Sequence, residues 1–122
     1  MKNLFFVAVV FFMAVTVSAQ TQEQLLGKWQ LVKWTKKGKD KDIADYYKTD
    51  QVFQVFKEGN KFESIVGDKT HKGTWKLNKD NTVLTITSGI VVADFTIDYF
   101  DAQKRIITYA TLGTLEYKKV SE

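Results

Sequence analysis

The chain of 122 residues contains no cysteine, no proline and a single histidine, His71. Without cysteine we expect neither disulfide bonds nor a lipid tether on an N-terminal cysteine, so packing and hydrogen bonds must hold the fold. One histidine without cysteine excludes a zinc cluster and a Ser-His or Cys-His pair with a spare histidine. The net charge of +4 is small and interspersed, which argues against a nucleic-acid partner.

Residues 1–19 have the three parts of a secretory signal peptide. Lys2 is the charged start, an apolar run extends from Leu4 to Val15, and Val17-Ser18-Ala19 is the small-residue end. The run is shorter than the roughly 20 residues that a membrane-spanning helix needs, so a signal is favoured over an anchor. We predict cleavage after Ala19 and a secreted or periplasmic protein, with residues 20–122 forming one domain whose first five polar residues fray.

Short β-branched and aromatic runs alternate with turn residues through the rest of the chain, which predicts an all-β domain. Short connections favour an eight-stranded antiparallel up-and-down barrel over a two-sheet sandwich. A charged loop at Lys36–Asp42 and a short helical turn at residues 43–47 are expected after the first strand. The expected strands are residues 28–35, 51–57, 61–66, 72–77, 82–87, 90–100, 105–110 and 114–120.

A glycine two residues before a tryptophan opens the first strand, as Gly27-Lys28-Trp29, and returns as Gly73-Thr74-Trp75. Glycine adopts backbone conformations that other residues avoid, and the tryptophan face is large enough to seal one end of a small barrel. We therefore expect Gly27 and Trp29 to form a structural plug. The repeated motif indicates two similar strand starts rather than a duplication, because the two halves of the domain share no other sequence similarity.

The chain carries an ordered set of motifs, which are Gly27-Lys28-Trp29, Phe56-Lys57-Glu58-Gly59 and Gly73-Thr74-Trp75-Lys76-Leu77, followed by Leu84-Thr85-Ile86. In this order and spacing the motifs resemble the lipocalins, and more closely the small lipocalin-like domains of exported bacterial proteins. The resemblance spans most of residues 20–122 and implies a calycin-type β-barrel and a secreted setting more firmly than an activity. The chain is shorter than a typical lipocalin and lacks its C-terminal helix.

Larger lipocalins carry a basic residue on the last strand that stacks over the first-strand tryptophan. The resemblance implies an equivalent residue here, and Lys118, Lys119 and Arg105 can each fill that role.

Inward-pointing aromatic rings are the candidate ligand-binding residues. Such a lining suits a small hydrophobic ligand, but the rings can equally fill the barrel as core, because small eight-stranded interiors are just wide enough for their own side chains. A slip of one residue would turn Phe53 and Val55 inward in place of Phe56. Ile43, Tyr46 and Tyr47 are expected to form a lid at the open end. In the expected register the rings are Phe56, Phe62, Trp75, Phe95, Tyr99, Tyr109 and Tyr117, together with Trp29.

Acidic residues do not form a recognisable site. The segment with Asp40, Asp42 and Asp45 lacks the glycine and closing glutamate of a calcium loop. Paired carboxylates for glycoside hydrolysis would have to converge, whereas Glu63, Asp94 and Asp98 fall mostly on predicted outer faces. His71 is expected to be solvated. We therefore predict no metal, no cofactor and no enzymatic activity.

Two hypotheses of function remain. The first is an exported, non-enzymatic barrel that binds a small hydrophobic ligand at its open end, near residues 36–47. The second is a barrel with a filled core that contacts another protein, as an inhibitor or assembly component, through Trp34, Val92 and Phe100 on its outer surface. Neither involves nucleic acid, and neither involves stable membrane insertion after signal cleavage.

Overall fold

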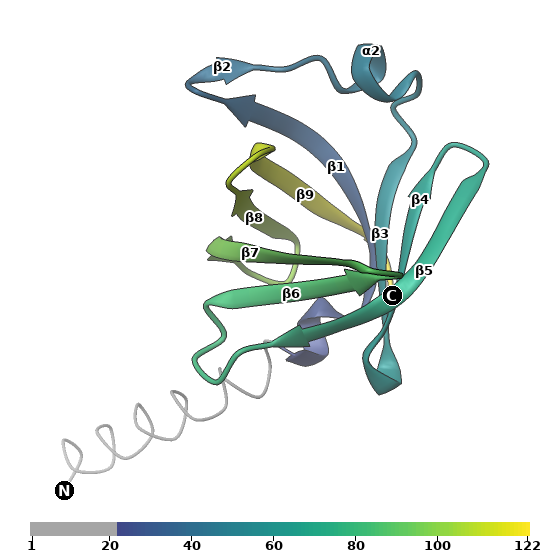
Figure 1. Ribbon diagram of the computed structural model, residues 1–122, viewed down its shortest axis with the longest axis vertical. Coiled ribbons are helices and arrows are strands. Elements are labelled where there is room, and N and C mark those ends of the chain that lie inside the picture. Colours follow the sequence, from purple (N-terminus) through teal and green to yellow (C-terminus); the bar gives the residue numbers. More distant parts are fainter. Residues whose placement is uncertain (1–21) are drawn as a thin grey trace, which may run out of the picture.

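Eight antiparallel strands close into a barrel in the computed structural model, which describes residues 22–122 (Figure 1). Each strand pairs with the next along the chain from β3 to β9, and β1 pairs with both β3 and β9. The β1–β9 pairing closes the sheet, so the predicted barrel is confirmed and the sandwich is excluded. The predicted signal peptide and its cleavage after Ala19 lie outside the described residues.

The strands follow the predicted positions, with ends that differ by a few residues. They are β1 (Gly27–Lys36), β2 (Lys39–Asp40), β3 (Val52–Lys57), β4 (Lys61–Val66), β5 (Lys69–Leu77), β6 (Val83–Ser88), β7 (Val91–Phe100), β8 (Lys104–Tyr109) and β9 (Gly113–Ser121). The short helices are α2 (Ile43–Tyr47) and η1 (Glu58–Asn60).

The charged segment after β1 is not simply the predicted loop. Lys36 pairs with Lys39, so β1 and β2 form a short hairpin that projects beyond the barrel. Lys37 and Gly38 between them have φ angles of +53° and +77°, as a tight two-residue hairpin turn requires. The charge pattern of this segment does not reveal the turn. The predicted helical turn α2 follows, capped by Asp42, whose carboxylate accepts a hydrogen bond from the Asp45 backbone N–H at 3.0 Å.

The polar residues before β1 are also more ordered than the predicted fraying implies. Residues 22–25 form a helical turn that ends in the buried Leu25. The carbonyl of Gln24 accepts a hydrogen bond from Lys119 Nζ at 2.7 Å, which ties this turn to the last strand. The turn lies at one end of the barrel, beside the start of β1 (Figure 1).

A β-bulge in β1 changes which residues face inward. The pairing of β1 with β9 shifts register between Leu31 and Lys33, so one extra residue is accommodated. Trp34 is therefore buried on the same side as Trp29 and Leu31, while Val32 is exposed. The prediction that this strand carries apolar residues on both faces was wrong for this reason.

A second bulge does the same in β7. The register with β8 shifts between Ile97 and Tyr99. Tyr99, predicted to point inward, is 45% exposed, and Phe100 packs against the core in its place.

Aromatic side chains fill the closed end of the barrel. Trp29 is fully buried, and its indole N–H donates to the Leu25 carbonyl at 2.8 Å. Phe56 packs edge-on against Phe62 and Trp75, at centroid distances of 5.2 and 5.7 Å. This end of the barrel is core, as one of the two sequence interpretations expected.

Gly27 occupies a position that only glycine fits. Its φ is +126°, and a Cβ there would lie 2.6 Å from the Ser121 carbonyl oxygen on β9. Strand β1 can therefore start directly beside the end of β9 and bring Trp29 into the closed end. That Gly27 and Trp29 act together as a plug stays a prediction.

Candidate ligand-binding pocket

Strands β5 and β6 pair over only part of their length. Only Thr74–Leu77 of β5 pair with β6, whereas residues 69–73 pair with β4 alone. Gly73 marks the point of departure, because a Cβ there would lie 2.1 Å from the Thr87 carbonyl oxygen. Beyond it, a hydrogen bond of 3.0 Å from Ser88 Oγ to the Lys72 carbonyl bridges the two strands. An opening into the barrel interior follows from this divergence.

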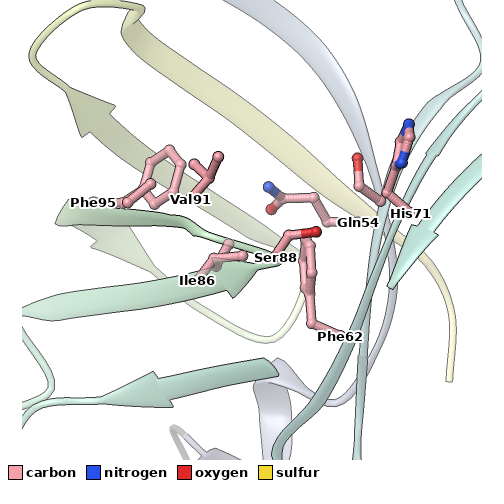
Figure 2. Close-up of a pocket in the computed structure, with 9 residues that line it drawn as sticks. Gln54, Phe62, His71, Ile86, Ser88, Val91 and Phe95 are labelled. Carbon is pink, nitrogen blue, oxygen red and sulfur yellow. The ribbon is translucent and has the colours of Figure 1, made fainter. Parts of the chain in front are cut away.

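A pocket of about 460 Å³ lies at this opening. Figure 2 shows Ile86, Val91 and Phe95 on one side of it and Gln54 and His71 on the other, with Phe62 below. The lining combines these apolar side chains and Ala93 with the polar groups of Gln54, Ser64, His71 and Ser88. Its volume lies within the range of roughly 300–1,000 Å³ that is typical of small-molecule sites.

The predicted ligand-binding residues divide into three groups. Phe62 and Phe95 line the pocket. Tyr99 lies outside the barrel, where its hydroxyl donates to Asp101 at 2.5 Å. The others belong to the core: Phe56, Trp75 and Tyr117 are buried, and the half-buried Tyr109 packs against Phe95.

Strand β3 has the expected register. Val52, Gln54 and Phe56 point inward and are buried, whereas Phe53 and Val55 are only partly buried. Gln54 is therefore an inward polar residue between two apolar ones. This alternation was a signal for a site residue that a search for aromatic rings missed.

Arg105 is the second inward polar residue that the sequence analysis did not place in the site. It begins the inward face of β8 and is 1% exposed. Its Nη2 donates to Gln54 Oε1 at 2.5 Å, while its Nε and Nη1 have no hydrogen-bond partner. Burial lowers the pKa of the guanidinium to about 9. This value is still above neutral pH, so the guanidinium stays protonated there.

Three aromatic rings surround this guanidinium. The Arg105 Cζ atom lies 4.2 Å from the ring centroid of Tyr117, 4.8 Å from Phe56 and 5.0 Å from Trp29. The negative ring faces attract the cation. Burial raises the pKa of Tyr117, so its hydroxyl stays neutral beside the cation.

Two of the three candidate basic residues lie over Trp29. Lys119 on the last strand places its Nζ 5.2 Å from the Trp29 ring, and Arg105 approaches the same ring from β8. Lys118 is exposed. Lys119 therefore matches the last-strand position that the resemblance implied, and Arg105 is an additional cation within the barrel.

The predicted lid residues lie away from the pocket. α2 packs beside Trp34, with ring centroids 4.9 Å apart for Tyr46 and 6.1 Å for Tyr47. Burial raises the pKa of the Tyr47 hydroxyl, and Tyr46 adds to the shift. Ile43 and Tyr47 pack against the core, and no residue of α2 lines the pocket between β3 and β7. Their function as a lid stays a prediction.

The outer surface predicted for a protein partner is largely absent. Trp34 is buried, with its indole N–H donating to the Leu112 carbonyl at 2.6 Å, and Phe100 packs on the core. Only Val92 of the three is exposed, beside Ile90 and Val91 at the turn between β6 and β7.

The pocket lining places a serine beside the histidine. Ser64 and His71 are cross-strand neighbours on β4 and β5, and both line it. A Ser-His pair usually needs an acid that orients the histidine, and no carboxylate is among the lining residues. Within residues 22–122, no cluster of His, Cys, Asp or Glu could hold a metal ion. The same part of the chain contains no helix long and apolar enough to cross a membrane.

A closed eight-stranded antiparallel barrel with one end filled by aromatic side chains defines a small up-and-down β-barrel. The chain belongs to the lipocalin-like domain family, whose family model matches residues 25–117. No curated protein matches it.

Solved structures share the fold. A lipocalin-like protein from Bacteroides uniformis is 19% identical, with a TM-score of 0.65 over 80% of this chain and 99% of that one. An uncharacterised protein from Bacteroides eggerthii is 17% identical, with a TM-score of 0.64 over 79% and 99% of the two chains. A DUF4847 family protein from Bacteroides vulgatus is 12% identical, with a TM-score of 0.53 over 79% and 94%.

Proposed function

We propose that this protein binds a small, largely apolar molecule in the pocket between β3 and β7. The observation that carries the proposal is a pocket of about 460 Å³ with Phe62, Ile86 and Phe95 in its lining. Burial of apolar ligand surface against such side chains supplies about 25 cal/mol for each Å² removed from water. The absence of a carboxylate from this lining favours binding over catalysis.

Titration with Nile red, a neutral dye whose emission rises in apolar surroundings, tests this proposal. We expect saturable uptake by the purified protein. Ala93→Trp would fill the pocket from the inward face of β7 and weaken dye binding about tenfold or more, a loss of roughly 1.4 kcal/mol. Val92→Trp places the same ring on the exposed face of that strand and serves as the matched control.

The outcomes separate clearly. Dye uptake that is lost in Ala93→Trp and kept in Val92→Trp supports binding in this pocket. Failure of the parent protein to take up the dye would contradict a cavity for apolar molecules, and equal uptake by both variants would move the site elsewhere.

Export is a further part of the proposal. The signal features of residues 1–19 support it. When the full-length chain is expressed in a bacterial host, N-terminal sequencing of protein recovered outside the inner membrane should read from Gln20. Retention of Met1 in protein confined to the cytoplasm would contradict export.

A further inference from the structure

Behind Gln54, which lines the pocket, lies an arginine without a counterion. Within the described part of the chain, Arg105 takes part in no ion pair, and its one hydrogen bond goes to the neutral amide of Gln54. Buried charges in proteins are normally paired, because removal from water is costly without a partner. The three surrounding rings attract the cation but leave Nε and Nη1 without acceptors.

Gln54 connects this cation to the pocket. Its side chain extends into the pocket in Figure 2, and its Oε1 accepts the hydrogen bond from Arg105 Nη2. The guanidinium is therefore one side chain away from the ligand space. An amide oxygen occupies the position where a stronger, charged acceptor would bind a guanidinium.

We propose that the pocket is specific for a monocarboxylic acid with an apolar body, whose carboxylate is held by Arg105 and Gln54. This inference rests on the proposed function and names its ligand class. The carboxylate replaces Gln54 Oε1 at Nη2 and reaches one of the free N–H groups, so that the guanidinium gains the two-point contact it favours. The Gln54 amide then turns its NH2 group toward the second carboxylate oxygen, and the apolar body lies against Phe62 and Phe95.

Competition between decanoic acid and 1-decanol tests the charge requirement. The two share a chain length and differ in the head group, and both displace bound Nile red if they enter the pocket. We expect decanoate to displace Nile red at a concentration about tenfold or more lower than decanol does. The reason is that charge-assisted hydrogen bonds are stronger than those of a neutral hydroxyl group. Equal competition would overturn this inference while leaving the proposed apolar pocket intact.

Variants assign the preference to these two residues. Arg105→Met keeps much of the side-chain volume and should abolish the preference for decanoate while decanol still competes. Lys104→Met removes the same charge from the exposed neighbour on β8 and should leave the preference unchanged. Unchanged preference in Arg105→Met would overturn the inference.

Gln54→Glu covers the case in which the buried arginine is needed for folding. It gives Arg105 an internal carboxylate. Competition by decanoate should therefore weaken about tenfold or more, while competition by decanol should not change. Gln51→Glu adds the same charge at an exposed position just before β3. If decanoate competes as well with Gln54→Glu as with the parent protein, the assignment to Arg105 and Gln54 is contradicted.

A direct readout separates this inference from the wider function. The Arg105 Nε–H resonance in a ¹H–¹⁵N spectrum should shift on addition of decanoate and not of decanol. Decanoate binding without that shift would overturn the arginine contact. Binding of decanoate but not of Nile red would support the acid site and contradict the general apolar pocket, whereas binding of neither would overturn both.

Discussion

Trp29 provides the sharpest test of how the barrel is held together. Trp29→Ala removes a fully buried indole from the closed end. Truncation of a buried tryptophan costs about 3–5 kcal/mol, because apolar contacts are lost and a cavity remains. It also leaves the Leu25 carbonyl without its donor at 2.8 Å and removes one of the rings around Arg105. We therefore expect a loss of about 3–5 kcal/mol.

Trp29→Phe separates the ring from its N–H group. Most of the apolar contact is kept, while the Leu25 carbonyl loses its hydrogen bond, so we expect a smaller cost of about 1–2 kcal/mol. This variant matters because a small domain is stable by only about 5–15 kcal/mol, and Trp29→Ala can consume most of that margin. Val32→Ala, at an exposed position on the same strand, should fall within about 0.5 kcal/mol of the parent protein.

Urea unfolding followed by far-UV circular dichroism measures these differences without relying on tryptophan fluorescence. The free energy of unfolding comes from linear extrapolation with the slope m compared across variants. A loss below about 1 kcal/mol for Trp29→Ala would refute the plug assignment, because it lies below the range for any well-packed large side chain. A loss in Val32→Ala as large as that in Trp29→Phe would refute the reasoning from burial.

Three further outcomes are expected. Gly73→Ala should cost about 1–3 kcal/mol in urea unfolding, because its Cβ would meet the Thr87 carbonyl oxygen at 2.1 Å; no change would mean that β5 can separate from β6 there freely. Phe100→Ala should cost about 2 kcal/mol and clearly more than Tyr99→Ala, and the reverse order would contradict the bulge in β7. The Tyr99 hydroxyl and two backbone N–H groups hold the pKa of Asp101 below its ordinary value. Its stabilisation is therefore present above an ordinary pKa of about 3.9 and is lost as pH falls through the lower folded value, so the difference in Tm between the parent and Asp101→Asn should close on acidification and should not grow.

The strands and the helical turn α2 were predictable because their signals are local. Alternation with period two and turn residues between strands each act over a few neighbours. Short connections then left the closed meander as the favoured topology. The family resemblance pointed to the same barrel through Gly27, Trp29 and the Gly73-Thr74-Trp75 motif.

The two bulges were not predictable from alternation. One inserted residue in β1 and one in β7 reverse the inward and outward faces of every residue that follows in the strand. Trp34 and Phe100 moved inward, and Tyr99 moved outward, for this single reason. The errors at Trp34 and Phe100 in the predicted outer surface and at Tyr99 in the predicted lining therefore have a common origin.

The pocket depends on a feature that lies between strands rather than within one. Its opening follows from the point at which β5 stops pairing with β6, and the contact of Gly73 with the Thr87 carbonyl sets that point. The buried polar pair behind the pocket, in contrast, has a local signal in the sequence, since Gln54 interrupts the inward face of β3 and Arg105 begins that of β8. A barrel interior that retains an arginine without an acidic partner is poorly explained by core packing alone, because an apolar residue of that size would fill the space without the desolvation cost. Residue types that cost stability at inward positions are therefore better guides to a binding site in this fold than the aromatic rings, which serve the core equally well.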